Sequence, residues 1–330
     1  MNMICLESHS RDPYFNLALE EFIFEKLNRD ESYFMLWQND NTIVVGNFQN
    51  TPEEVNQEFV EKHGIRVARR LSGGGAVYHD TGNLNFTFVV HQADLESFNF
   101  KFFVLPVIRV LEQMGIHAEF NGRNDITIEG CKISGNSQFI RGKRILHHGC
   151  IMLDSNLANV AGALRPKDAK FESKSVKSIR SRVTTINAHA PSPVSMEQFK
   201  GMLNSAVSRD NPLTPMELSK EQLEEVRRLR DEKYSTWEWN YGKSPEYNLK
   251  RERKFQAGLV TAYLQVANNR VKSIRFFGDF FGSGQLQELE SSMESLPLDT
   301  GLTASLQKLN IGHYMNGITA QDIYQLLMYD

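Results

Sequence analysis

The chain has 330 residues, too many for one average domain, and this length suits one large domain with a smaller second one. Its formal net charge of −3 provides no general attraction to nucleic acid or to an anionic membrane, so neither is an expected partner. The three cysteines lack CxxC spacing, and neither a secretion signal nor an apolar run of roughly 20 residues is visible. We therefore expect a cytoplasmic protein without a disulfide framework or a zinc knuckle.

The first half of the chain predicts helices and strands in irregular order. Asp12 and Pro13 are typical of a helix start, and apolar residues at helical spacing follow as far as Leu27. Predicted strands cover 33–38, 42–46, 65–71, 75–79, 84–90 and 144–153, and helices are predicted from about Pro52 and over 98–114. Because regular βαβ alternation is missing, we expect an α+β fold with a mixed sheet rather than a doubly wound fold.

The second half of the chain divides at a segment rich in turn-forming residues. Capping boxes at Ser195 and Ser219 predict two helices, and the string NYGKSPEYN (240–248) follows them. We expect a catalytic domain over residues 1–246, a linker over 247–253 and a small accessory α+β domain over 254–330. Within this last part, Asn268-Asn269 predicts the turn of a hairpin.

The most distinctive string is RRLSGGGAVYHD, residues 69–80. Three consecutive glycines allow backbone N–H groups to approach a ligand closely, and oriented amides of this kind bind anions. Arg70 is able to add a bidentate contact to a phosphate or a carboxylate. The alternative is a glycine-rich hairpin or bulge with a surface arginine pair. Neither a GxxxxGK[ST] loop nor a complete GxGxxG is present, which excludes the two common phosphate-binding motifs.

Two further strings contain candidate ligand-binding residues. Lys132 lies in a β pattern between Gly130 and Gly135, where small neighbours leave room for an ammonium to bridge an acyl oxygen and a phosphate. An exposed lysine is the alternative. Next, His147 and His148 must point to opposite faces of a strand. His148 is therefore either a ligand for ribose or phosphate or a satisfied, partly buried residue.

The stretch 165–182 is rich in lysine and arginine and has the composition of a long loop. It includes Lys174 and Arg180 but contains a single aromatic residue, Phe171, which argues against stacking with successive nucleic-acid bases. A solvated loop is one interpretation. The other is a lid that closes over an anionic, water-sensitive adenylate.

Together these strings resemble the lipoate–protein ligase family, over most of the chain. RRLSGGGAVYHDTGNLNF is similar to the lipoate-binding loop of the family, and GRNDITIEGCKISGNSQ is similar to the segment with its essential lysine. HHG, followed by LRPKDAKFESKSVKSIRSRVTTI, resembles the adenylate-binding region, and WEWNYGKSPEYN (237–248) resembles the signature that closes the large domain. The remainder is similar to the accessory C-terminal domain of the longer ligases.

The resemblance implies a catalytic domain like those of biotin ligases and class II aminoacyl-tRNA synthetases. It also implies two half-reactions: lipoate and ATP give lipoyl-AMP and pyrophosphate with Mg²⁺, and the lipoyl group then passes to a lysine. The acceptors it implies are lipoyl domains of 2-oxoacid dehydrogenase E2 subunits or the H protein of glycine cleavage. We expect the enzyme to act as a monomer. Selection between lipoate and octanoate stays open at this stage.

By motif position, the resemblance assigns roles to individual residues. Lys132 is the catalytic residue, and the ATP contacts are Arg70, Gly75, Ala76, Val77, Tyr78 and Lys132. The lipoate contacts are Ser72, Gly73, Gly74, Gly75, His79 and Lys132. Further candidates are Asn83, Asp125, His148, Lys174 and Arg180, and no ligand of the metal is assigned.

One departure from the family pattern is Cys150, which follows HHG where threonine is common in the family. Related octanoyl- and lipoyltransferases use a cysteine thioester without ATP, so this route is an alternative. No base partner for Cys150 or Cys131 is evident, and Cys131 should point away from the face of Lys132. A non-catalytic lipoate-binding accessory protein is a further alternative, but the glycine and lysine strings are intact here.

Overall fold

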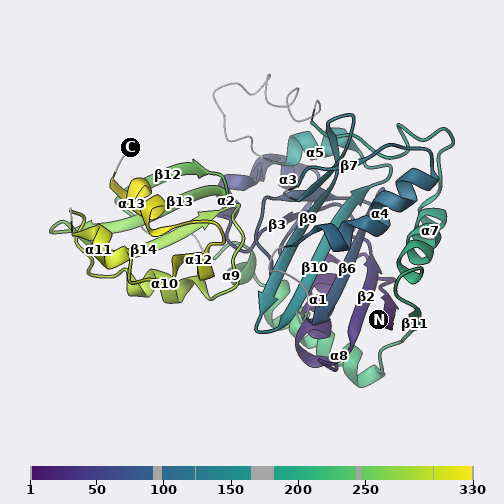
Figure 1. The fold of residues 1–330 in the computed structure, drawn as a ribbon, viewed down its shortest axis with the longest axis horizontal. Helices are drawn as coiled ribbons and strands as arrows, with labels where there is room; N and C mark the ends of the chain where they lie inside the picture. Colours follow the sequence, from purple (N-terminus) through teal and green to yellow (C-terminus); the bar gives the residue numbers. More distant parts are fainter. Residues whose placement is uncertain are drawn as a thin grey trace.

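The computed structural model describes residues 2–91, 99–122, 124–164, 182–242, 247–299 and 301–328. These residues form two parts, one built on a large sheet and one on a small sheet with its own helices (Figure 1). Helices and strands are interspersed in the large part, whereas three strands precede the helices in the C-terminal part, and the expected α+β class is confirmed. Within the described ranges, no helix is both long enough and apolar enough to cross a membrane.

In the described part of the chain, the large sheet has eight strands in the order β11-β1-β2-β6-β10-β9-β8-β7. The bounds are β11 (Leu213–Pro215), β1 (Met3–Glu7), β2 (Ser32–Trp37), β6 (Asn83–His91), β10 (Arg144–Met152), β9 (Cys131–Arg141), β8 (Asp125–Ile128) and β7 (Glu119–Phe120). Strand β1 pairs in parallel with β2 and β11, and the other neighbours are antiparallel. The sheet is therefore mixed, as expected.

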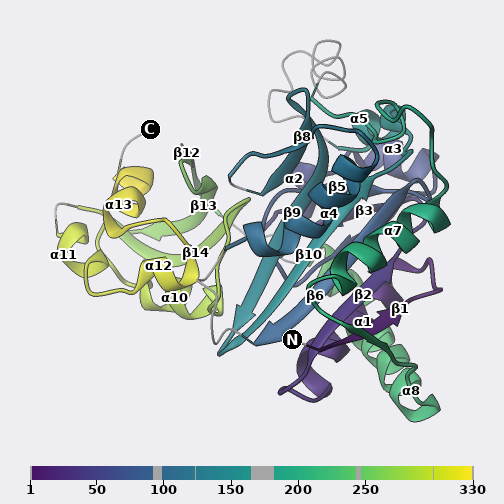
Figure 2. The ribbon, with the colours of Figure 1, turned by 45° about the vertical axis from the view of Figure 1, so that its right-hand side comes forward.

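Helices cover both faces of this sheet (Figure 2). Helices α4 (Lys101–Gln113) and α7 (Met196–Ser208) pack on one face, and α1 (Pro13–Lys26) and α8 (Lys220–Leu229) pack on the other. Strand β2 is buried along its whole length and shows the two-residue period directly: Phe34 and Leu36 join the core under α4, whereas Tyr33, Met35 and Trp37 join the core under α1.

A second sheet of the large part has the order β4-β3-β5, with β4 (Arg66–Arg69), β3 (Thr42–Val45) and β5 (Val77–His79). The predicted strand over 75–79 is two residues too long, because β5 begins only at Val77. The triglycine loop, defined here as residues 72–76, therefore lies outside any strand. Short helices complete this part: α2 (Thr51–Glu54), α3 (Gln57–Lys62), α5 (Leu157–Ala163), a π-helical turn (Arg230–Tyr234) and α9 (Trp237–Asn240).

The C-terminal part has a separate core around the sheet β12-β13-β14. Its elements are β12 (Leu249–Phe255), β13 (Gly258–Ala267), β14 (Arg270–Gly278), α10 (Leu286–Ser292), α11 (Leu302–Leu306), α12 (Ile311–Tyr314) and α13 (Ala320–Met328). The hairpin turn at Asn268-Asn269 is confirmed, and both residues have positive φ. The prediction of a linker over 247–253 is wrong for residues 249–253, which belong to β12. Five consecutive charged residues in LKRERKF hide the strand pattern.

The two parts meet beside the triglycine loop. The Phe48 ring stacks on Phe280 with 4.9 Å between centroids and belongs to the core of the C-terminal part. The carbonyl of Phe48 accepts a hydrogen bond of 2.6 Å from the Gly278 N–H. A residue of the large part thus fixes the position of the small one.

Arg69, at the end of β4, connects segments that are distant in the sequence. Its side chain is fully buried, and it donates to the carbonyls of Gly46 (2.9 Å), Gln49 (2.8 Å) and Asn240 (3.0 Å). It thereby ties the turn after β3 to α9, which contains the WEWN string. Burial lowers the pKa of Arg69 to about 10, so the guanidinium remains charged at neutral pH.

Replacement of this arginine tests its structural role. Arg69→Met should lower the free energy of unfolding by about 3 kcal/mol, because several buried carbonyls lose their donor at once. Urea unfolding followed by fluorescence measures the change. The control Arg29→Met removes a side chain that is 71% exposed and should stay within about 0.5 kcal/mol of the unchanged protein. Equal stability of both variants would contradict the assigned role.

Candidate active site

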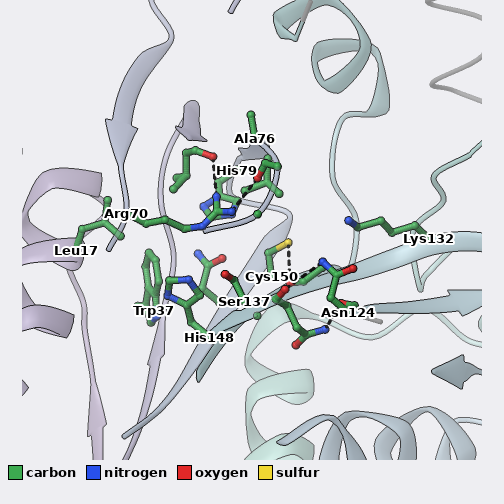
Figure 3. A pocket seen from close by; sticks show the side chains of 18 residues that line it. Leu17, Trp37, Arg70, Ala76, His79, Asn124, Lys132, Ser137, His148 and Cys150 are labelled. Atoms are coloured by element: carbon green, nitrogen blue, oxygen red, sulfur yellow. Dashed lines mark hydrogen bonds between the residues drawn. The ribbon is translucent and has the colours of Figure 1, made fainter. Parts of the chain in front are cut away.

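A single cavity lies between the triglycine loop, α1 and strands β9 and β10 (Figure 3). The sequence-predicted residues on its wall are Arg70, Gly74, Gly75, Ala76, Val77, His79, Lys132 and His148. Wall residues that the sequence analysis did not single out as ligand contacts are Leu17, Trp37, Val44, Asn85, Asn124, Gly135, Asn136, Ser137, Gly149 and Cys150. The glycine string and the lysine string therefore meet at one site, although about sixty residues separate them in the sequence.

Arg70 holds the triglycine loop from inside. Its guanidinium donates to the carbonyls of Gly73 (2.7 Å), Gly75 (2.8 Å) and Val44 (3.1 Å), and its Nε donates to Ser72 Oγ (3.1 Å). Four of its five N–H groups are thus engaged within the described chain. Burial lowers the pKa of Arg70 to about 10, which leaves the group cationic at neutral pH. A direct contact with ATP has at most one N–H available.

The three glycines meet different surroundings. A Cβ on Gly73 would lie 2.2 Å from the carbonyl oxygen of Phe280, so this position packs against the C-terminal part. Gly74 has a φ of +87°, a conformation that favours glycine. A Cβ on Gly75 would meet no atom within 4 Å, so Gly75 faces open space in the cavity. Only the third glycine thus presents its backbone to an occupant without crowding.

A buried chain of polar groups anchors the loop to α1. Ser72 Oγ lies 2.6 Å from His148 Nε2, and His148 Nδ1 lies 3.0 Å from a carboxylate oxygen of Glu20. Glu20 in turn accepts from Thr87, whose hydroxyl also accepts from the Trp37 indole at 2.9 Å. The order Ser-His-Glu is that of a hydrolase triad, but Ser72 is 1% exposed and does not line the cavity. The chain therefore positions the loop.

This chain changes the interpretation of His148. Both of its ring nitrogens have partners within the protein, so neither is available for the expected hydrogen bond to ribose or phosphate. The histidine is instead a satisfied wall residue. His147 points to the other face of β10, as expected, and stacks on Phe103 with 4.3 Å between ring centroids.

Lys132 lies on the opposite side of the cavity from Trp37 and Leu17 (Figure 3). Its Nζ is 2.8 Å from Asp125 Oδ1, and its side chain is 30% exposed. This contact is an ion pair without the angles of a hydrogen bond, since Asp125 Oδ1 has no hydrogen-bond partner. Gly135 provides the room for the ammonium, because a Cβ there would lie 2.8 Å from Nζ.

The segment after the basic stretch docks on the backbone of Lys132. The Lys132 N–H donates to the Arg182 carbonyl at 2.8 Å, and the Thr184 N–H donates to the Lys132 carbonyl at 3.0 Å. Lys174 and Arg180 lie outside the described residues. Their expected contact with an adenylate stays a prediction.

Five predicted residues do not line the cavity: Ser72, Gly73, Tyr78, Asn83 and Asp125. The Tyr78 side chain packs in the core behind β3, and its hydroxyl donates to Asn41 at 2.9 Å. Tyr78 instead borders a separate surface depression with Asp80 and Asn156, so its side chain is not placed for the expected ATP contact. Asn83 is buried on β6, two residues before Asn85, and of these two asparagines Asn85 lines the cavity.

Sequence reasoning missed Glu20 and Trp37. A signal for Glu20 did exist, because an acidic residue stands among the apolar residues of a helix that is otherwise buried on that face. Trp37 lies on the same face of β2 as Tyr33 and Met35, so the sequence pattern predicts an ordinary core residue at this position.

The different surroundings of Gly73 and Gly75 provide a matched pair of variants. Gly73→Ala should lower the free energy of unfolding by about 1–3 kcal/mol, because the new methyl group clashes with the Phe280 carbonyl. Gly75→Ala should change it by less than about 0.5 kcal/mol. Denaturant unfolding of the two variants checks the difference, and the reverse order of stability would refute this packing.

Comparison with known proteins agrees with the geometry of the site. The lipoyl protein ligase A/B catalytic domain family matches residues 12–208, and the bacterial lipoate protein ligase C-terminus family matches residues 244–327. Lipoate-protein ligase LplJ of Bacillus subtilis is 40% identical over 321 residues, which cover 96% of this chain and 97% of the relative.

Three solved structures are similar in fold. LipL1 of P. falciparum in complex with lipoate has a TM-score of 0.83 at 24% identity, with full coverage of both chains. A bipartite lipoate protein ligase from Thermoplasma acidophilum, solved in a study of the ligase and its E2 lipoyl domain, has a TM-score of 0.66 at 30% identity and covers 75% of this chain and 98% of its own. A lipoate-protein ligase A bound with ATP has a TM-score of 0.64 at 28% identity and covers 73% of this chain and 98% of its own. The chain belongs to the lipoate–protein ligase family, as the two family matches and the relative matched over 97% of its length show, in agreement with the cavity.

Proposed function

We propose that this chain is an ATP-dependent lipoate–protein ligase that forms lipoyl-AMP and then transfers the lipoyl group to a lysine of an acceptor protein. The observation that carries this proposal is the shared cavity of the triglycine loop, Arg70 and Lys132. Family membership supports it, and relatives are named for lipoate and ATP.

Electrostatics explains why the first half-reaction needs these residues. A carboxylate and an α-phosphate repel each other, yet they must come within near-attack distance. The buried Arg70 cation lowers the energy of both anions, and Lys132 supplies a second, more mobile charge. Lys132 Nζ exchanges Asp125 for the acyl and phosphate oxygens, while a lipoate oxygen attacks the α-phosphorus and pyrophosphate leaves.

The same charged residues act in the second half-reaction, in which the bond between the acyl and phosphate groups breaks. The acceptor amine attacks the acyl carbon of lipoyl-AMP, an amide bond forms, and AMP leaves with the bonding electrons. Lys132 stabilises the negative charge that returns to the phosphate. The amine gives up one proton to water as the amide forms. The backbone at Gly75 faces the cavity without crowding, which allows an anion to approach it closely.

The tail of lipoate needs an apolar slot. Leu17, Trp37, Val44 and Val77 line the cavity, and Leu17 and Trp37 lie on the side away from Lys132 (Figure 3). A ligand that places its carboxylate at Lys132 extends its hydrocarbon chain toward this side. Such a division into an apolar wall and a few polar groups is typical of small-molecule sites.

Mg²⁺ is proposed as the partner of ATP. Asp125 fits as a protein ligand, because its buried Oδ1 accepts no hydrogen bond and becomes available to a cation once Lys132 turns from it to the substrates. Mg²⁺ is usually held by one or two carboxylates together with substrate phosphates, and it neutralises part of the charge of ATP. Asp125 thus also fixes the resting position of Lys132.

The proposed acceptors are lipoyl domains of 2-oxoacid dehydrogenase E2 subunits or the H protein of glycine cleavage. The Thermoplasma acidophilum ligase was studied with an E2 lipoyl domain, which supports the first class. We further propose that the chain acts as a monomer.

Lipoate-dependent ATP–pyrophosphate exchange tests the function. Lys132→Ala should lower the exchange rate by roughly 100-fold or more, because a charge that stabilises the transition state is lost. The control Lys143→Ala removes an exposed lysine at the β9–β10 turn and should leave the rate unchanged. No exchange by the unchanged protein, or full exchange by a folded Lys132→Ala variant, would contradict the proposal.

Cys150 provides the test against a thioester route. The cysteine lines the cavity, but its Sγ donates to the Gly135 carbonyl at 3.6 Å, and both ring nitrogens of the neighbouring His148 have partners. The Cys150→Thr variant should therefore still lipoylate an apo lipoyl domain in the presence of ATP, and mass spectrometry of the lipoyl domain measures this modification. Loss of transfer together with a trapped acyl-cysteine in the unchanged protein would favour the ATP-independent transferase.

A further inference from the structure

The end of the cavity opposite Lys132 contains a histidine whose role goes beyond filling space. His79 is 3% exposed, it lines the cavity, and Figure 3 shows it with Leu17 and Trp37 on the side away from Lys132. Burial, and then the nearby Arg70 and His148, lower the pKa of His79 to about 3. The ring is therefore neutral at physiological pH, with one nitrogen protonated and one bare.

A hydrogen-bond network determines which nitrogen carries the proton. The Asn16 amide nitrogen donates to the backbone carbonyls of Ser10 (3.0 Å) and Gln38 (2.8 Å), which fixes the orientation of that amide. The same nitrogen donates to Asn39 Oδ1 at 3.0 Å, so the amino group of Asn39 must face His79. That group lies 3.2 Å from His79 Nδ1. Nδ1 is therefore the acceptor, and the proton resides on Nε2.

The proton on Nε2 has no acceptor. Among the described residues, no atom makes a hydrogen bond with His79 Nε2, although the nitrogen is buried. Asn85 adds a second unsatisfied atom among the residues that line the cavity: its Oδ1 accepts from Asn83 at 2.9 Å, and its Nδ2 has no partner among the described residues. If both amides are turned round, an atom of Asn85 is still unpaired. Buried polar atoms without partners are rare and point to a ligand that satisfies them.

The expected occupant of this end is the tail of the acyl substrate, so the following inference rests on the proposed function. The tail of lipoate ends in a dithiolane ring, whose sulfur atoms are weak hydrogen-bond acceptors. The tail of octanoate ends in a methyl group, which accepts nothing. An octanoate complex therefore leaves the buried N–H unsatisfied, whereas a lipoate complex does not.

We propose that His79 is a specificity-determining residue, whose Nε2–H, together with the unsatisfied amide of Asn85, selects a sulfur-containing ring over a hydrocarbon tail of the same length. Leu17, Trp37, Val44 and Val77 accept either tail by shape and apolar contact. The discrimination comes from the polar atoms. Asn39 is a positioning residue, because it fixes the tautomer of His79.

Equilibrium binding tests this proposal without requiring turnover. Calorimetry compares lipoate with 5-cyclopentylpentanoate, which has a five-membered ring in the same place but no sulfur. The unchanged protein should bind lipoate roughly tenfold more tightly, the effect of one hydrogen bond to a buried donor. His79→Leu should bring the two affinities together, His79→Gln should restore part of the difference, and the exposed control His91→Leu should keep it whole.

Two results would overturn the proposal: equal affinity of the unchanged protein for both ligands, or an undiminished preference in a folded His79→Leu variant. If that variant fails to fold, the comparison of ligands on the unchanged protein decides. Nitrogen NMR of the His79 ring provides a second reading, because the Nε2–H signal should shift with lipoate and stay in place with the carbocyclic acid. ATP–pyrophosphate exchange separates the two claims: exchange without ring selectivity contradicts only this inference, and ring selectivity without exchange contradicts only the ligase function.

Discussion

The guanidinium of Arg70 is the group on which the site depends. A loop with three glycines has little intrinsic preference for one shape, and ordering it costs conformational entropy. Arg70 offsets this cost with hydrogen bonds to the carbonyls of Gly73 and Gly75. Because these carbonyls point toward the guanidinium, the backbone at Gly75 is held at the cavity. The same buried cation makes the cavity attractive to anions.

The neighbouring residues Arg69 and Arg70 stabilise different segments of the chain. Arg70 faces the triglycine loop, whereas Arg69 points to the other side of β4 and binds the turn after β3 and α9. The WEWN string is thus a structural partner of Arg69, which explains why a signature so far from the cavity accompanies the glycine string. The Phe280 carbonyl touches Gly73 from the C-terminal part, so the position of that part and the shape of the loop are linked.

Patterns with local causes could be predicted from the sequence. The cap at Asp12, the hairpin at Asn268-Asn269 and the opposite directions of His147 and His148 follow from short-range geometry. The family resemblance, and not either string alone, predicts that Arg70 and Lys132 lie at one site. Strands β1 and β12 escaped prediction, since β1 is short and β12 has five consecutive charged residues, although their exposure alternates. Glu20 and the orphaned N–H of His79 escaped it as well, because only the tertiary fold creates their surroundings.

The division of labour between Arg70 and Lys132 is the central claim, and a crystal structure of this chain with lipoyl-AMP tests it most directly. Arg70 should still donate to the carbonyls of Gly73 and Gly75, while Lys132 Nζ leaves Asp125 for the oxygens that join the acyl and phosphate groups. The dithiolane ring should lie between Trp37 and His79. An Arg70 side chain that has released the loop to bind the phosphate, or an adenylate bound outside this cavity, would contradict it.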